Sequence, residues 1–341
     1  MCPGGTDDSV NDPFLDVQNS ESSDGDSAFE EGDINSLTTS LSSSVLAYVY
    51  ENGRRYHQLR EGNYIFPNDE KEQDRLDMLH HVYSLVQGGR LHVAPISNPQ
   101  RVLDMGTGTG LWALDFADEF PEADVMGLDV TPIQPQWTPV NCQFIIDDLE
   151  EDWDYPESQH FDYIHQRSMS GSIGSWPRLY QQALQNMKPN GWIEIQEFDV
   201  WFYSQVSGGL PEDSSIMKWQ KMIDQASRGL GRPLNYASEF AKHLEDAGFV
   251  DVQTQVIKTP IGTWPKDPKL RELGAFLQAQ MNEALEAVTL GYFTRVLGWS
   301  DIETQVMLAH VKKEFNDKSK LLYTFCRFVT GRKPGKTGKS S

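Results

Sequence analysis

The stretch RVLDMGTGTG, residues 101–110, decides the fold that this sequence predicts. A short apolar run ends at Met105, and three of the next five residues are glycines. Glycine is needed where backbone dihedrals are unusual or where a ligand approaches the main chain closely. A helix that begins near Leu111 would present unpaired amide groups to an anionic ligand. The stretch therefore predicts a buried strand, a tight ligand-binding turn and a helix.

Short apolar runs alternate with helical stretches on both sides of this turn. The predicted strands cover residues 101–105, 124–129, 142–147, 161–165 and 191–196. The helices expected between them cover residues 111–120 and 177–187. Strands and helices in alternation predict an α/β protein with a parallel sheet covered on both faces. Such a sheet binds its ligands beyond the carboxyl ends of its strands.

Further elements are expected before and after this core. Apolar residues recur at helical spacing over residues 76–86, and Gly88 stands where such a helix would end. Later helices are predicted at residues 214–228, 236–248, 267–288 and 300–315. The runs at 249–258 and 320–332 predict two final strands that form an antiparallel edge.

Composition divides the chain into segments. It has 341 residues, 38% of them apolar, with a net charge of −21. The N-terminal stretch is acidic, rich in serine and too poor in apolar groups to offset its ordering entropy. The expected segments are a disordered acidic tail (1–44), a helical cap (45–98), the main domain (99–330) with helical insertions at about 210–232 and 267–316, and a basic disordered tail (331–341). An acidic surface repels phosphate backbones, so no nucleic-acid partner is expected.

The cysteines predict a reducing compartment. Cys2, Cys142 and Cys326 are too few and too scattered for a disulfide framework or a zinc cluster. His80 and His81 lack a second ligand pair at metal spacing, so no metal is expected. No secretion signal and no membrane-spanning apolar run is found. We therefore expect a soluble protein of the cytoplasm or the nucleus, without a membrane partner.

Acidic residues at the ends of predicted strands indicate a nucleoside site. Asp129 ends the second strand, where a carboxylate can accept hydrogen bonds from ribose hydroxyls. Asp147 and Asp148 end the third strand, within reach of an adenine amino group. Leu111 stands where the dinucleotide fingerprint needs a small residue, which weakens an NAD-dependent oxidoreductase as an alternative. The phosphate-binding motif of nucleoside triphosphatases is missing from the sequence.

The whole pattern resembles class I S-adenosylmethionine-dependent methyltransferases, and within them the LaeA-like methyltransferases of fungi. The resemblance rests on YENGRRYHQLREGNYIFPNDEKEQDRLD, VLDMGTGTGLWALDFADEFPEADVMGLDVTPIQPQW, CQFIIDDLEEDW, FDYIHQRSMSGSIGSW and MKPNGWIEIQEF. It runs from about Tyr48 to Trp201 and weakens over the C-terminal helices. It implies a Rossmann-like sheet of seven strands in the order 3-2-1-4-5-7-6, with the seventh strand antiparallel and a helical lid. The implied cofactor is S-adenosyl-L-methionine.

The resemblance also implies a set of cofactor-binding residues. These are Asp104, Gly106, Thr107, Gly108, Thr109, Gly110, Asp129, Ile133, Gln134, Asp147, Asp148, Leu149 and His165. The glycine loop would lie beside the methionine portion, and Asp104 would act through its carboxylate or through water. Asp129 would hold the ribose, and Ile133 or Gln134 would flank the adenine. Leu149, with one of the two neighbouring aspartates, would close its other side.

The resemblance places His165 where it would face the transferred methyl group. Its unperturbed pKa suits a general base, which is needed only if the acceptor loses a proton. A strand-end histidine with a satisfied hydrogen bond is an equal alternative. Gln166, Arg167 and Glu197 are comparable candidates for substrate contact. The aromatic run at residues 201–203 predicts either a wall of the acceptor pocket or part of the core.

Two functions fit these observations. The first is methylation of a small-molecule acceptor in fungal secondary-metabolite biosynthesis. The alternative is a LaeA-like nuclear regulator of secondary metabolism, working with a protein partner and with weak or protein-directed methyltransferase activity. A deep apolar pocket roofed by residues 210–232 and 267–316 would favour the first function, because small ligands are mostly enclosed in their sites.

Overall fold

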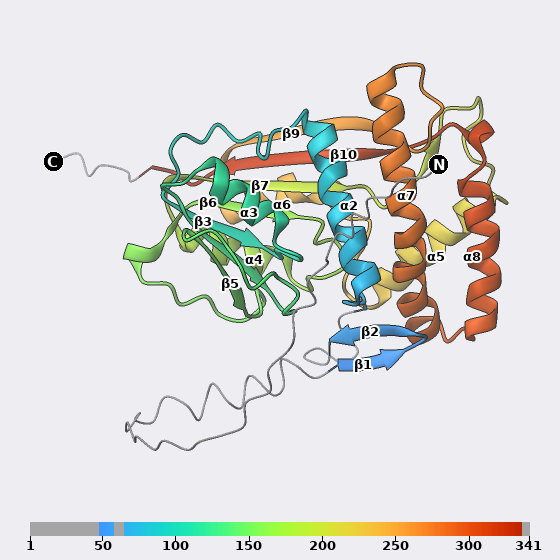
Figure 1. Ribbon diagram of the computed structural model, residues 1–341, viewed down its shortest axis with the longest axis horizontal. Helices are drawn as coiled ribbons and strands as arrows, with labels where there is room; N and C mark the ends of the chain where they lie inside the picture. The colour runs from blue at the N-terminus through green and yellow to red at the C-terminus, as the bar shows by residue number, and fades with distance from the viewer. Residues whose placement is uncertain (1–47, 58–64, 336–341) are drawn as a thin grey trace, which may run out of the picture. The chain divides into compact units, whose positions relative to one another are not determined.

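The computed structural model describes residues 48–57 and 65–335, and Figure 1 shows how their helices and strands are arranged. The expected acidic tail lies outside the described residues. The strands are β1 (Tyr48–Glu51), β2 (Arg54–His57), β3 (Arg101–Met105), β4 (Asp124–Asp129), β5 (Cys142–Ile146), β6 (Phe161–Arg167), β7 (Met187–Phe198), β8 (Tyr203–Ser204), β9 (Val250–Pro260) and β10 (Leu322–Arg332). The longer helices are α2 (Glu70–Gln87), α3 (Leu111–Glu119), α4 (Trp176–Gln185), α5 (Ser215–Gly229), α6 (Phe240–Ala247), α7 (Pro268–Leu290) and α8 (Asp301–Phe315).

The main sheet has the strand order β5-β4-β3-β6-β7-β10-β8, and β9 pairs with β10. Strands β3 to β7 are parallel neighbours, whereas β10 runs antiparallel to both β7 and β9. With the strands counted along the chain from β3, and the two-residue β8 left aside, the order is 3-2-1-4-5-7-6. This order and the antiparallel seventh strand confirm the predicted fold class.

Helices cover both faces of the sheet. Val102 on β3 packs in an apolar cluster with Trp112 and Phe116 of α3. Its neighbour Leu103 packs in a second cluster, which includes Phe240 of α6 and several residues of α4. Because successive side chains of a strand point to opposite faces, α3 covers one face while α4 and α6 cover the other.

A third apolar cluster joins the remaining helices. It contains Tyr83 of α2, Trp219 of α5, Leu277 of α7 and Val311 of α8, together with residues of β7 and β10. Helix α2 packs on α7, and α8 packs on both α5 and α7. Figure 1 shows α5, α7 and α8 together beyond one end of the long strands β7 and β10. These three helices lie in the stretches where helical insertions are expected.

The segment expected to be a helical cap begins instead with a β-hairpin. Strands β1 and β2 pair around Asn52 and Gly53, whose φ angles are 51° and 74°. Asn-Gly favours this two-residue turn because both positions need positive φ. The dipeptide is therefore a sequence signal for a hairpin, and the prediction missed it. Arg54 on β2 donates to Asp69, which also accepts a hydrogen bond from the first turn of α2. The hairpin is thereby tied to the helix.

Three predicted boundaries need correction. The last strand continues through Gly331 and Arg332, which pair with β7, so the expected basic tail begins too early. Strand β7 begins at Met187, where a helix was predicted to end. Strand β6 extends to Arg167, two residues further than predicted. Strand pairing supplied by neighbouring strands, rather than local periodicity, sets these ends.

Candidate active site

A cavity lies at the carboxyl ends of the five parallel strands. Its walls come from the segments after β3, β4, β5, β6 and β7, and from helices α2, α5 and α7. Ten of the thirteen predicted cofactor-binding residues line it: Asp104, Gly106, Thr107, Gly108, Thr109, Asp129, Ile133, Asp147, Asp148 and Leu149. Gly110, Gln134 and His165 do not line it.

The glycine loop after β3 has the geometry of a close-approach turn. Gly106, Gly108 and Gly110 have φ angles of 65°, 58° and 84°, which side chains other than glycine rarely adopt. A Cβ atom at Gly108 would point toward Leu76 of α2, 3.6 Å away across the cavity lining. Gln134 Nε2 donates to the carbonyl of Gly108 at 2.7 Å, so it holds the loop from behind. The loop is shaped by backbone freedom that only glycine provides.

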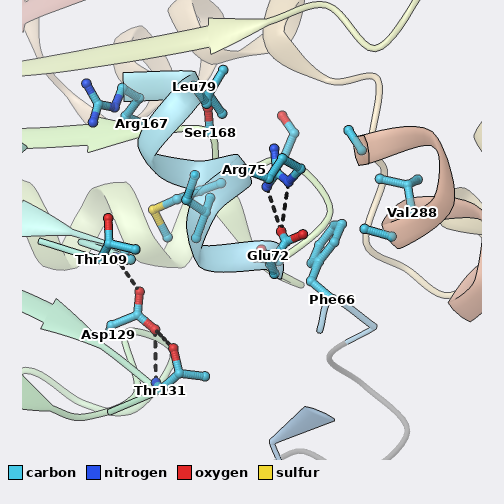
Figure 2. Close-up of a pocket in the computed structure, with 18 of the residues that line it drawn as sticks. Phe66, Glu72, Arg75, Leu79, Thr109, Asp129, Thr131, Arg167, Ser168 and Val288 are labelled. Carbon is cyan, nitrogen blue, oxygen red and sulfur yellow. Dashed lines mark hydrogen bonds and ion pairs between the residues drawn. The ribbon is translucent and has the colours of Figure 1, made fainter. Parts of the chain in front are cut away.

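Asp129, the last residue of β4, ties the end of that strand to the glycine loop. Its Oδ2 accepts from the Gly108 amide at 2.8 Å, and its Oδ1 accepts from the amide and hydroxyl of Thr131 at 2.9 and 2.7 Å, as Figure 2 shows for Thr131. Burial raises the pKa of Asp129, and these hydrogen bonds oppose the rise. A carboxylate has about four acceptor positions, so about one remains for a ligand hydroxyl.

His165 has the position of the second alternative given above, a histidine in the strand that is held by a hydrogen bond, rather than one that faces the cavity. The side chain is fully buried, stacks on Trp112 of α3 with ring centroids 3.6 Å apart, and does not line the cavity. Its Nδ1 bonds to Asp104 Oδ1 at 2.7 Å, while the other oxygen of Asp104 accepts from Thr107 Oγ1 at 2.6 Å. His165 thus supports the residue that holds the glycine loop, and the geometry contradicts its assignment as a general base facing the methyl group.

Arg167 occupies the strand-end position that His165 was expected to have. Strand β6 runs two residues further than predicted, and residues two apart on a strand share a face. Arg167 lines the cavity, its Nη2 bonds to His80 Nδ1 at 2.9 Å, and its guanidinium lies over the ring of Tyr83. Of the three further candidates for substrate contact, Arg167 and Glu197 line the cavity, whereas Gln166 is buried outside it.

Glu197, near the end of β7, is a buried carboxylic acid in the cavity wall. Its side chain is 4% exposed, and Oε2 accepts from the backbone amide of Ser170 at 3.0 Å. Burial raises the pKa of Glu197 to about 7, although hydrogen bonds from Ser170 oppose the rise. In the described part of the chain no basic side chain forms an ion pair with it. It can therefore exchange a proton near neutral pH.

The far half of the cavity is apolar and comes from elements distant in sequence. Its wall includes Phe66, Leu79, Phe198, Val200, Phe202, Trp219, Leu234, Met281, Ala284, Leu285, Ala287 and Val288. Several of them are nearly fully buried, such as Phe202 and Trp219 at 2% exposure. The sequence left open whether the aromatic run at residues 201–203 lines the acceptor pocket or belongs to the core. Phe202 of this run lines the pocket. Figure 2 shows Phe66 and Val288 near the ion pair that Arg75 makes with Glu72.

Sequence reasoning missed the contribution of α2 to this wall, and it expected α5 and α7 as a roof without identifying the residues that line the cavity. The apolar spacing within α7, at Leu277, Met281, Leu285 and Val288, predicted a helix with a buried face. Periodicity does not distinguish a face against the core from a face against a cavity. Gln280, a buried polar side chain of the same helix, also lines the cavity.

Within residues 48–57 and 65–335, no group of three or more His, Cys, Asp or Glu side chains is arranged to hold a metal ion. Among the helices of those same ranges, none is long and apolar enough to cross a membrane.

Sheet order, glycine loop and strand-end carboxylate together define the class I methyltransferases, which use S-adenosylmethionine. Comparison with known families agrees, since residues 78–254 match a family described as a methyltransferase domain. The chain belongs to this family and is an S-adenosylmethionine-dependent methyltransferase.

Its relatives among known fungal proteins are named as methyltransferases or as regulators of secondary metabolism. Methyltransferase pytC of Aspergillus terreus is 44% identical over 83% of this chain and 87% of the relative. The secondary metabolism regulator LAE1 of Cochliobolus heterostrophus is 39% identical over 83% of this chain and 94% of its own length. The protein-methionine methyltransferase laeA of Emericella nidulans is 34% identical over 83% of this chain and 76% of its own length.

Proposed function

We propose that this enzyme binds S-adenosylmethionine on the glycine-loop side of the cavity and methylates a small, largely apolar acceptor on the helical side. The reaction belongs, on this proposal, to fungal secondary-metabolite biosynthesis, since several relatives are named as secondary metabolism regulators. One observation carries the proposal. A single cavity joins the glycine loop to a buried apolar compartment walled by α5 and α7.

The residues on the loop side fit the cofactor. Gly108 leaves room beside the main chain, and Asp129 keeps an acceptor position for the ribose. Ile133 can flank the adenine, with Leu149 and the neighbouring Asp147 and Asp148 on its other side. The bound cofactor supplies a methyl group on a positively charged sulfur. The chain contributes alignment and the exclusion of water.

The helical side fits an apolar acceptor with few polar groups. Small-molecule sites combine apolar walls with a small number of placed polar groups. Here those groups are the carboxyl of Glu197 and Gln280 Oε1, and the second is buried and lacks a hydrogen-bond partner among the described residues. An acceptor that carries a hydroxyl or amine could satisfy them. Glu197 lies where it could hold such a proton.

The compartment and partners are proposals as well. The buried thiols Cys142 and Cys326 suit a reducing compartment, which supports the cytoplasm or the nucleus. The acidic composition supports a small-molecule acceptor rather than nucleic acid. A protein acceptor, which the name of one laeA relative states, is the alternative that the experiment must exclude, together with a regulatory partner.

A bulky residue in the apolar wall tests the proposal. Ala284 of α7 lines the cavity, whereas Ala279 on the same helix is exposed and lies outside it. The protein is incubated with methyl-labelled cofactor and a fungal culture extract, and label is counted in the small-molecule and protein fractions. We expect label in the small-molecule fraction, lost in Ala284→Trp and retained in Ala279→Trp. Label on protein, or full turnover by Ala284→Trp, contradicts the proposal.

A further inference from the structure

Arg167 is a charged side chain in the cavity wall without a carboxylate partner. It is half-buried, and in the described part of the chain no Asp or Glu forms an ion pair with it. Asp104 is close but has both oxygens engaged, with His165 and with Thr107. Burial lowers the pKa of Arg167, a sign that its charge is poorly solvated. A desolvated charge is stabilised mainly by pairing, so this site suits an anionic group of a ligand.

The guanidinium is held in one orientation by protein groups. Burial and the charge of Arg167 lower the pKa of His80 to about 4, so the imidazole is neutral at neutral pH. We therefore assign His80 Nδ1 as the acceptor from Arg167 and Nε2 as the donor to Asp115 Oδ2, at 2.9 Å. The Tyr83 ring lies under the guanidinium, 5.0 Å from its centre. An arginine has five N–H donors, so enough remain for a carboxylate.

The position of Arg167 favours the amino-acid end of the cofactor as the source of that carboxylate. Met105 of β3 pairs with Gln166 of β6. This pairing brings the next residues, Gly106 and Arg167, side by side at the carboxyl ends of the two strands. Both residues line the cavity, as does His80. The methionine portion is expected at this glycine, whereas the apolar acceptor compartment is walled by α5 and α7.

We propose that Arg167 binds the carboxylate of the methionine portion of S-adenosylmethionine, and that His80 and Asp115 are positioning residues for it. The inference rests on the cofactor site of the proposed function. An acidic acceptor is the other source of a carboxylate, and the experiment separates the two. The proposed interaction is a non-covalent ion pair.

The test uses two ligands that differ by one carboxylate. Isothermal titration measures the affinities of S-adenosylhomocysteine and of its decarboxylated analogue, S-adenosyl-3-thiopropylamine. We expect the wild type to prefer S-adenosylhomocysteine by about 10- to 100-fold, the size of a charge-assisted contact. Arg167→Met should lose that preference while keeping its affinity for the analogue within about 2-fold. The retained affinity for the analogue is the internal control for folding.

Each other outcome overturns the assignment. Equal losses for both ligands in Arg167→Met would show a structural role, and unchanged affinities would show no contact. 2-Naphthoate, an apolar carboxylate, serves as the probe for an acidic acceptor. If Arg167→Met binds S-adenosylhomocysteine normally, but its complex with S-adenosylhomocysteine no longer binds 2-naphthoate, the carboxylate belongs to the acceptor. A wild type that binds neither nucleoside contradicts the proposed function itself rather than the role of Arg167.

The positioning role of His80 has its own variant pair. His80→Leu removes the acceptor for Arg167, and we expect it to reduce the preference for the carboxylate about 3- to 10-fold. His80→Gln offers an amide oxygen and should restore most of it. The adjacent His81, which is exposed and stacks on Phe276, serves as control through His81→Leu, with no change expected. An unchanged preference in His80→Leu contradicts the positioning role.

Discussion

Replacing Glu197 by glutamine removes a charge that its surroundings barely solvate. The carboxyl is 4% exposed, and its surroundings add no nearby positive charge that pairs with it. The titratable groups that face it are Tyr83 of α2, Tyr180 of α4 and Cys326 of β10, all kept neutral by burial, and Arg167 shares its cavity. Glutamine has the same shape and can still accept the hydrogen bond from the Ser170 amide.

The magnitude follows from the raised pKa. Burial raises the pKa of Glu197 from 4.5 to about 7. Since one pKa unit corresponds to about 1.4 kcal/mol, ionising this group costs roughly 3 kcal/mol more in the folded protein than in the unfolded chain. The folded protein holds the proton more tightly, so this stabilisation is complete below the unfolded-state pKa and is lost as the pH rises through the folded-state pKa. Glu197→Gln lacks this dependence.

Urea unfolding, followed by tryptophan fluorescence, measures the effect. Between about pH 5 and pH 8, the free energy of unfolding of the wild type should fall by roughly 2 to 3 kcal/mol relative to Glu197→Gln. Glu212→Gln, at an exposed position paired with Lys221, should follow the wild type within about 0.5 kcal/mol. If the difference between wild type and Glu197→Gln is the same at both pH values, the carboxyl is not the desolvated group that the structure shows.

Two further predictions concern the loop and the residue behind it. Gly108→Arg should lower the affinity for S-adenosylhomocysteine by at least about 100-fold in isothermal titration, because the side chain enters the cavity from a left-handed backbone position. Gly208→Arg, also at positive φ but with open space around it, controls for backbone strain, and equal effects of the two changes would contradict the steric reason. His165→Ala should lower the free energy of unfolding by about 2 to 4 kcal/mol, because it leaves Asp104 without its partner and removes the stack on Trp112. A His165→Ala protein of normal stability that transfers methyl groups slowly would restore the assignment of His165 as a base.

Local patterns in the sequence were sufficient for the order of elements and for half of the site. The glycines after Met105 and the acid at Asp129 could be assigned because strand, turn and helix chemistry depends on neighbouring residues. The hairpin at Asn52 and Gly53 could also have been predicted, since its turn signal is local. The individual side chains that α2, α5 and α7 place in the cavity wall could not, because apolar periodicity is the same against a core and against a cavity.

The sequence by itself determined that a parallel sheet carries a glycine loop and an acidic strand end, which is the cofactor half of the site. Tertiary structure alone decided which side chain stands at the end of β6. Pairing with β7 prolongs the strand to Arg167, so His165 lies beneath Trp112 and Arg167 reaches the cavity. The physical reason is that a strand ends where its neighbours stop supplying hydrogen bonds, and those neighbours are distant in sequence.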